Sequence, residues 1–296
     1  MGDVSLPPSV QWREGPNGVP VLHVETDGHV ADIAANGAHL LNWIPRGQQP
    51  ILWMSRSSRF AAGVPIRGGV PVCFPWFGQL PGHPEAPMHG FARLCEWQLL
   101  RVTEGSSGVE LVFRLTEAGE HFARFWPHRF EALYTVAIGA ELGMTLEVVN
   151  HDDSPFAFEA VLHSYYAVAD ARPATVRGLE GLEFRPKGST STQRDDVPVA
   201  IGSGISRRYP DTADATIVDP GNRRTMTIKP AGARSAILWN PGAEIAQSME
   251  DFDDEGWKSM VCYESGNVGD TAILLAAGER NAMSVTVSVS TDRPSA

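Results

Sequence analysis

The chain has 296 residues, of which 43% are hydrophobic and 20% charged, and its formal net charge at pH 7 is -11. This apolar content is enough for a sizeable core, and the length fits one large β domain or two small ones. The negative charge argues against nucleic acid and against an anionic membrane surface as partners, since both require a basic face on the protein. An anionic small molecule would need a local group of arginines to hold it.

The start of the chain and its cysteines indicate the compartment. The first ten residues, MGDVSLPPSV, lack the basic and apolar regions of a signal peptide. The cysteines Cys73, Cys95 and Cys262 lie in apolar contexts, without the spacing of a zinc site or the even number of a disulfide framework. We therefore expect a cytoplasmic protein with buried thiols and no bound metal.

Alternation of apolar and polar residues is the dominant pattern along the chain, and it indicates strands. In chain order, the candidate strands are Val21–Glu25, Val109–Leu115, Phe130–Ile138, Leu142–Val149, Phe156–His163, Thr225–Pro230, Ala236–Trp239, Met260–Glu264, Thr271–Ala276 and Met283–Ser290. Gly, Pro, Asn or Asp separate them at short intervals. Such spacing is typical of an all-β antiparallel sandwich or barrel.

Helical periodicity is scarce, and the best candidates are short pieces near Thr116–Phe125 and Glu244–Phe252. The chain has neither a βαβ rhythm nor a phosphate-binding G-x-x-x-x-G-K loop, which argues against a nucleotide-binding α/β fold. Residues Arg185–Ser206 are interpreted as an exposed excursion. No segment is long enough to act as a linker, so we predict one domain over residues 1–296.

The segment Arg67–Arg93 is the strongest candidate for a ligand-binding site. It contains RGGVPVCFPWFG followed by MHGFAR, which combines a rigid aromatic run with two arginines and a histidine. Apolar surfaces with a few converging polar groups are how small-molecule sites are usually built. Taken singly, each arginine fits a surface position or an ion pair, but the two together at the ends of one segment indicate an anion clamp.

Two residues outside that segment are candidates for acid–base chemistry. His163 ends the apolar strand FAFEAVLH and Glu264 ends MVCYE, positions where an ionisable group is either satisfied locally or opens onto a cavity. Together they would supply a general acid and a general base. The acidic run Glu250–Glu255 lacks the spacing of a calcium loop and is interpreted as a solvated loop.

Five motifs in order, RGGVPVCFPWFG, HGFAR, LHSYYAV, LWNPGAE and MVCYESGNV, resemble those of the hexose-6-phosphate mutarotases. These are the glucose-6-phosphate 1-epimerase branch of the aldose 1-epimerase superfamily. The resemblance extends from about Val21 to Val289. It implies a β-supersandwich of the galactose mutarotase type, a carbohydrate cleft, no cofactor and a hexose phosphate as substrate, and we expect a monomer.

The resemblance also implies roles for five residues. His163, in the His-x-Tyr motif, corresponds to the general acid that protonates the ring oxygen. Glu264 corresponds to the base that takes the proton of the anomeric hydroxyl. Arg67 and Arg93 match the arginines that contact the phosphate, and His89 matches a histidine that orients the substrate.

Two positions depart from the family pattern, and both concern substrate contacts. Met88 stands where many members have Gln or Ser, and Ser206 stands where an acidic residue is frequent. Two alternatives remain open: a mutarotase for unphosphorylated aldoses, which would not need both arginines, and a sugar-binding sandwich without catalysis, which would need neither His163 nor Glu264. A glycosidase would require two facing carboxylates, and only Glu264 can be nominated.

Overall fold

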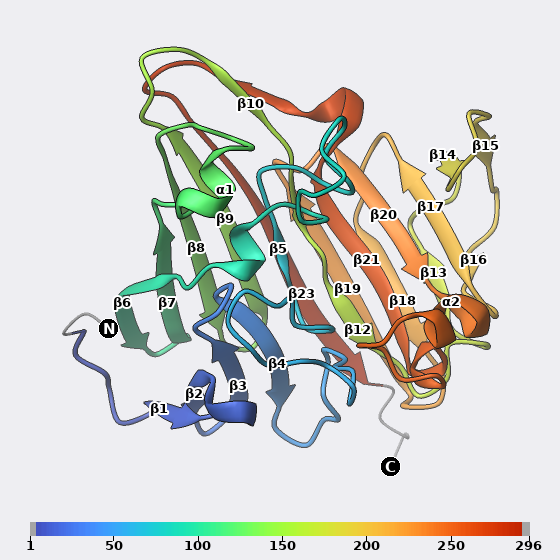
Figure 1. Cartoon of the computed structure of the whole chain (residues 1–296). Helices are drawn as coiled ribbons and strands as arrows, with labels where there is room; N and C mark the ends of the chain where they lie inside the picture. The colour runs from blue at the N-terminus through green and yellow to red at the C-terminus, as the bar shows by residue number, and fades with distance from the viewer. Residues whose placement is uncertain (1–3, 292–296) are drawn as a thin grey trace.

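The computed structural model describes residues 4–291, and most of its regular structure is antiparallel sheet (Figure 1). The larger sheet has nine strands. In spatial order they are β16 (Val199–Ala200), β13 (Thr175–Arg177), β18 (Ala215–Asp219), β19 (Arg224–Ala231), β23 (Arg280–Thr291), β9 (Leu142–Asn150), β8 (Phe130–Ile138), β7 (Gly108–Leu115) and β6 (Gln98–Gly105).

The second sheet has eight strands and positions the site described below. Its order is β15 (Gln193–Arg194), β14 (Glu183–Pro186), β17 (Ile205–Tyr209), β20 (Ser235–Asn240), β21 (Met260–Asn267), β11 (Ala160–Leu162) and β5 (Val72–Cys73). The eighth strand, β12 (Tyr165–Ala167), also pairs with β21. All eight residues of β21 are buried, as expected for a central strand that is covered on both faces.

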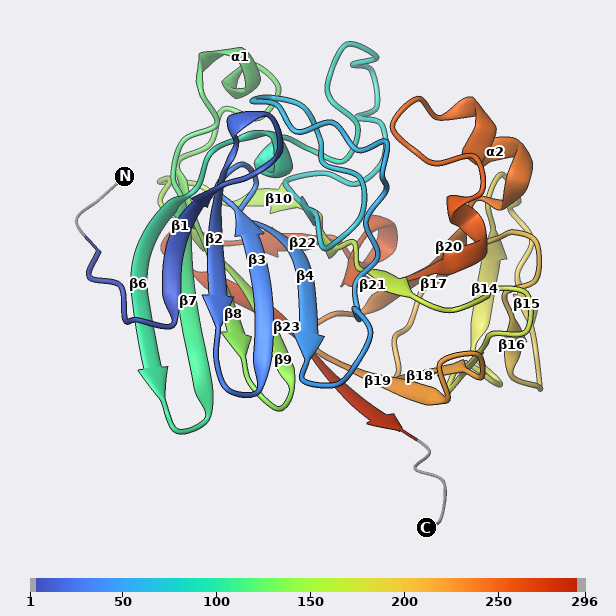
Figure 2. The same cartoon turned by 90° about the horizontal axis from the view of Figure 1, so that it is seen from below.

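The remaining elements are smaller. A four-stranded sheet contains β1 (Val10–Glu14), β2 (Pro20–Glu25), β3 (His29–Ala34) and β4 (His39–Pro45), and a two-stranded sheet pairs β10 (Phe156–Phe158) with β22 (Ile273–Leu275). The helices are α1 (Glu120–Ala123), α2 (Gly242–Ser248) and the 3-10 turns Pro16–Gly18, Ala92–Leu94, Gly256–Ser259 and Gly269–Thr271. Figure 2 shows α2 on the side of β14, β17 and β20, away from β6 and β7. Within residues 4–291, no helix has the length and apolarity needed to cross a bilayer.

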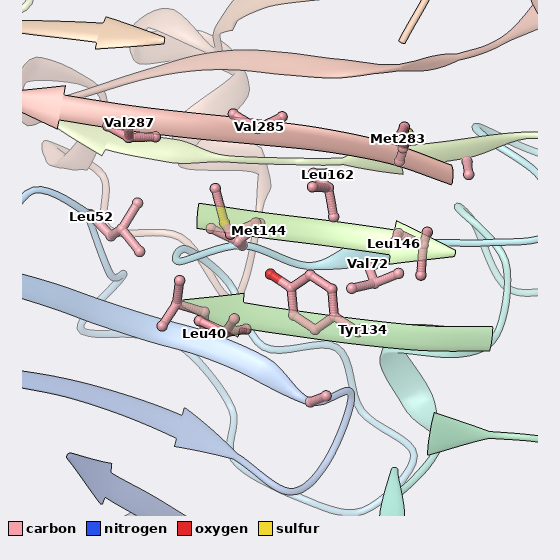
Figure 3. Close-up of a cluster of buried hydrophobic side chains, with 14 of the residues drawn as sticks. Leu40, Leu52, Val72, Tyr134, Met144, Leu146, Leu162, Met283, Val285 and Val287 are labelled. Carbon is pink, nitrogen blue, oxygen red and sulfur yellow. The ribbon is translucent and has the colours of Figure 1, made fainter. Parts of the chain in front are cut away.

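The main core lies between the nine-stranded sheet and the layer opposite it. Every second residue of β8 is buried, so one face of that strand points inward and the other faces outward. Figure 3 shows Tyr134 and Met144 of the larger sheet meeting Leu40, Val72 and Leu162 from the facing elements. This packing holds the eight-stranded sheet against the nine-stranded sheet.

The structure confirms the all-β antiparallel fold and most predicted strands, and Phe130–Ile138 is β8 without change. The prediction of one strand over Phe156–His163 was wrong. That segment forms β10 and β11, which join different sheets and are separated by Glu159. The carboxylate of Glu159 accepts backbone N–H groups from Phe77 and Gly269, so this residue anchors two loops instead of continuing the strand.

Three further expectations differ from the structure. Glu264 lies inside β21, which continues to Asn267, instead of ending a strand. The helices at the two helical candidates, α1 and α2, are shorter than the predicted segments, and α2 begins two residues before the predicted start. The segment Arg185–Ser206 is exposed over most of its length, as expected, but it includes the end of β14 and the start of β17, and several of its side chains line the cleft described next.

Candidate active site

A cleft of about 600 Å³ opens over one face of the eight-stranded sheet. It brings together every residue that the sequence nominated, which are Arg67, His89, Arg93, His163 and Glu264. These residues come from segments nearly two hundred positions apart, and the fold brings them together. Trp239, Phe77 and Met249 supply apolar lining.

His163 and Glu264 lie directly opposite each other across two neighbouring strands. The register pairs Leu162 with Ser265 on one side and Tyr165 with Cys262 on the other, which places the two residues in a cross-strand pair. The distance from Nε2 of His163 to Oε1 of Glu264 is 3.5 Å. Their side chains are 8% and 2% exposed, so both groups have little contact with solvent.

Burial decides the ionisation of this pair. It raises the pKa of Glu264 well above its usual value, because the carboxylate is desolvated. Burial, followed by the charges of His89, Arg67 and Arg93, lowers the pKa of His163. Both shifts favour the uncharged forms, a carboxylic acid beside a neutral imidazole. Nδ1 of His163 and Oε2 of Glu264 are buried without a hydrogen-bond partner in the part of the chain that the structure describes.

Aromatic rings hold the imidazole of His163 in place. Tyr165 stacks on it with ring centroids 4.7 Å apart and an interplanar angle of 5°. Trp239 meets the same imidazole edge-on at 6.2 Å. Since Tyr165 and His163 are two positions apart, their side chains lie on one face of the extended chain. The sequence analysis did not single out Tyr165 or Trp239.

His89 faces the same cleft as a neutral hydrogen-bond donor. Its Nδ1 accepts the backbone N–H of Gly78 at 3.1 Å, which leaves the proton on Nε2. Burial, together with the charge of Arg93, lowers the pKa of His89 to about 3. Its ring lies 4.5 Å from that of Phe77 and 5.7 Å from that of His163. At neutral pH it can therefore donate to a hydroxyl or phosphate oxygen.

Of the two predicted clamp arginines, Arg67 is already engaged inside the protein, whereas Nε of Arg93 is buried without a hydrogen-bond partner among residues 4–291. Nε and Nη2 of Arg67 donate to Asp251 at 3.2 and 3.1 Å, and Nη1 donates to the hydroxyl of Tyr165 at 3.0 Å. Burial lowers the pKa of Arg67, but its interactions with Tyr165 and Asp251 outweigh this effect and the net shift is upward. Arg93 is 7% exposed, and its Nη2 donates to the carbonyl of Met88 at 2.6 Å.

Asp251 is a site residue that the sequence analysis missed. It belongs to the run Glu250–Glu255, whose interpretation as a solvated loop was wrong at two positions. The Asp251 side chain is 19% exposed and binds Arg67, and that of Asp253 is 15% exposed and accepts the backbone N–H of Arg56. The run docks on the segment before Arg67, and its local sequence contains no signal of that distant contact.

We expect Asp251→Asn to lower the free energy of unfolding by about 1–3 kcal/mol, because the charged hydrogen bonds of a half-buried guanidinium are lost. The affinity for substrate should fall as Arg67 moves. Urea denaturation and KM measure the two effects. Asp254→Asn, an exposed position in the same acidic run, is the matched control and should change neither. Equal effects of both substitutions would mean that Asp251 acts only through general charge.

An antiparallel sandwich of this kind is the fold of the galactose mutarotase-like proteins. A crystal structure of a galactose mutarotase-like protein from Clostridium acetobutylicum superposes with a TM-score of 0.75 at 14% identity, over 96% of this chain and 98% of that one. At that identity the likeness concerns the fold alone. Residues 20–288 match the model of the aldose 1-epimerase family, and the chain belongs to that family.

Two bacterial proteins show the likeness in more detail. An Escherichia coli (strain K12) protein named "Putative glucose-6-phosphate 1-epimerase" is 34% identical over 250 residues, which cover 81% of each chain. The crystal structure of a "putative mutarotase" from Salmonella typhimurium has a TM-score of 0.90 and 30% identity, and covers 97% of this chain and 96% of that one. The resemblance inferred from the five motifs is thereby confirmed.

Proposed function

We propose that this protein is a mutarotase that interconverts the α and β anomers of hexose 6-phosphates, with glucose 6-phosphate as the expected substrate. The observation that carries the proposal is the buried cross-strand pair His163 and Glu264, which faces a cleft lined by cations. The family membership and the names of the relatives support the same activity. We further propose that it acts as a monomer in the cytoplasm, without a cofactor.

Ring opening needs a proton removed from the anomeric hydroxyl and a proton delivered to the ring oxygen. Glu264, as carboxylate, takes the first proton, and His163, as imidazolium, gives the second while the bond between C1 and the ring oxygen breaks. The free aldehyde turns about the C1–C2 bond. The same two residues then work in reverse, and the ring closes on the other face.

The proton count of this cycle balances within the pair. Before ring opening one proton is on His163, and after it one proton is on Glu264, so the pair holds one proton throughout. The two states have the same net charge and differ only in where that proton lies. The free protein favours the state with protonated Glu264 and neutral His163, as argued above. Contacts made by the bound cyclic sugar must therefore favour the charged state.

The other nominated residues are proposed to hold the substrate. His89 would donate from Nε2 to a sugar oxygen, and Arg67 and Arg93 would contact the phosphate. Each arginine flanks the aromatic segment that carries His89. Their assignment as phosphate contacts stays a prediction from the resemblance.

Exchange NMR between the anomers of glucose 6-phosphate, with and without the protein, tests the proposed function. We expect acceleration by the wild type and a loss of about 10²–10⁴-fold in His163→Asn, the range that general acid–base catalysis supplies. His121→Asn, at an exposed position outside the cleft, is the matched control. No acceleration with any hexose 6-phosphate would favour a binding protein without catalysis, and equal acceleration of free glucose would favour the unphosphorylated aldoses.

A further inference from the structure

A cysteine that the proposed chemistry does not use lies beside the catalytic pair. Cys262 and Glu264 are two positions apart in β21, so their side chains point to the same face of that strand. His163 faces Glu264 from the short connection between β11 and β12. One ring nitrogen of His163, Sγ of Cys262 and one carboxylate oxygen of Glu264 all lie within 4.8 Å of one another. We call these three side chains the donor cluster.

The donor cluster has the composition of a zinc site with an open position. Imidazole nitrogen, thiolate sulfur and carboxylate oxygen are the ligands that bind Zn²⁺, and a site with three protein ligands keeps its fourth position for water or another small ligand. Two ligands of one tetrahedral zinc are about 3.3–3.8 Å apart. Nε2 of His163 and Oε1 of Glu264 already lie 3.5 Å apart. A separation of 4.8 Å within the cluster needs to shorten by about 1 Å.

The surroundings of Cys262 exclude the other common roles of a thiol. Its side chain is fully buried and packs in a cluster with Tyr165, Trp257 and Met260. Burial, followed by the charge of Glu264, raises the pKa of the Cys262 thiol well above its usual value. A buried, neutral thiol is a poor nucleophile and a poor target for oxidation. Metal coordination remains, because a bound cation deprotonates the thiol outright.

The charges around the donor cluster are compatible with a divalent cation. The ion reaches the cluster through the cleft, which His163 and Glu264 line. Zn²⁺ replaces the proton of the Cys262 thiol and that of the Glu264 carboxylic acid, and both protons leave to solvent. The loaded cluster, with one dication and two anionic ligands, therefore presents no net charge to Arg67 and Arg93. The cations of the cleft slow the approach of the ion but do not oppose the bound state.

The donor cluster lacks the outer contacts of a permanent zinc site. A histidine that binds zinc usually donates its other ring N–H to a carboxylate or a carbonyl, which fixes the ring and strengthens the bond. Nδ1 of His163 has no hydrogen-bond partner within residues 4–291. Stacking on Tyr165 orients this ring without adding a hydrogen bond. An ion bound here is therefore expected to exchange with solvent, unlike the zinc of a structural site.

We infer that His163, Cys262 and Glu264 form an inhibitory site for zinc or a similar thiophilic divalent cation. The ion occupies the imidazole nitrogen and the carboxylate that the proton cycle uses, and it lies where C1 of the sugar would react. Zinc and sugar phosphate therefore exclude each other. Inhibition by the ion rests on the proposed function, whereas binding of the ion does not.

Exchange NMR with glucose 6-phosphate tests the inhibition, with free Zn²⁺ set by a metal buffer. We expect Zn²⁺ to stop anomer exchange reversibly and Mg²⁺ at the same concentration to have no effect, because Mg²⁺ prefers oxygen ligands. The Zn²⁺ concentration for half inhibition should rise about tenfold when the sugar phosphate is at ten times its KM. It should rise about 100-fold in Cys262→Ser, because the thiolate ligand is lost. Each protein is compared with its own rate in the presence of a chelator.

Cobalt provides a readout that needs no turnover, because a thiolate bound to Co²⁺ adds an intense charge-transfer absorption in the near ultraviolet. We expect this band in the wild type, its loss when glucose 6-phosphate is added, and its absence in Cys262→Ser. Cys95→Ser removes a thiol that is only partly buried, whereas Cys73 and Cys262 are buried. It is the matched control and should retain both the cobalt band and the inhibition by zinc.

Three results would overturn the inference: no inhibition of the wild type by zinc, equal inhibition of the wild type and Cys262→Ser, or a cobalt spectrum without the thiolate band. Loss of the band in Cys95→Ser would also overturn it, since the metal would then lie at that thiol. If Cys262→Ser does not fold, the cobalt spectra of the wild type with and without sugar phosphate still decide. If the wild type accelerates no anomerisation, the proposed function is contradicted, and the cobalt spectra still test the site.

Discussion

Glu264→Gln is expected to lower kcat for anomer exchange by about 10²–10⁴-fold, the range of a general base. The amide has nearly the same shape as the carboxyl group but accepts no proton at neutral pH. KM should change little, because the cleft and its cations are retained. This substitution separates catalysis from binding more cleanly than a truncation to alanine, which would open a cavity in a strand that is wholly buried.

The same substitution should stabilise the protein at neutral pH. Burial raises the folded-state pKa of Glu264 above its value in the unfolded chain, so the folded state binds more protons. Stability contributed by this group is complete below the unfolded value, near 4.5, and is lost as pH rises toward the folded pKa. Glutamine does not ionise, so the variant loses no stability in this way as pH rises. We therefore expect the free energies of unfolding of variant and wild type to diverge as pH increases above 4.5.

Urea denaturation between pH 4 and pH 8, together with exchange NMR, measures both effects. Glu244→Gln, an exposed position in α2, is the control and should alter neither activity nor the pH dependence of stability. If Glu264→Gln retains turnover, Glu264 is not the general base. A stability difference that does not grow with pH would mean that the carboxyl group is already ionised in the folded protein.

Much of the fold could be predicted from the sequence because its signals are local. β8 and β9 alternate buried and partly exposed residues over most of their length, and that alternation can be seen in the sequence. The break between β10 and β11 could not be predicted. It depends on Glu159, whose partners Phe77 and Gly269 are 82 and 110 positions away. A local apolar pattern contains no information about such contacts.

The residues of the candidate site likewise divide into those with a local sequence signal and those that depend on distant contacts. His163 and Glu264 were found because ionisable residues in apolar strands are conspicuous, and the motifs around them resemble those of a known family. Asp251 lies in a run of acidic residues, where nothing local distinguishes it from its neighbours. Lys187 and Arg208 reach the cleft only through the order of β14, β17, β20 and β21 in the sheet, which no local pattern predicts.

Gly90→Ala should be among the most damaging single substitutions in the site, with an expected loss of about 4–7 kcal/mol in the free energy of unfolding. Gly90 has φ +74°, and an added Cβ would lie 2.1 Å from the carbonyl oxygen of Phe74. That oxygen accepts the backbone N–H groups of Phe91 and Ala92. Overpacking costs about 1–3 kcal/mol, the left-handed backbone about 1–2, and the disturbed hydrogen bonds about 1 each.

Gly82→Ala separates backbone strain from the clash. Gly82 has φ +79°, but a Cβ added there meets nothing within 4 Å, so only the backbone term of about 1–2 kcal/mol is expected. Since His89 precedes Gly90 and Arg93 follows three residues later, Gly90→Ala should also lower kcat/KM, and Gly82→Ala should not. Urea denaturation and exchange NMR on the two variants measure this difference. Equal losses of stability would show that the loop moves away from Phe74 at little cost, and that the close approach of Gly90 does not hold His89 in the cleft.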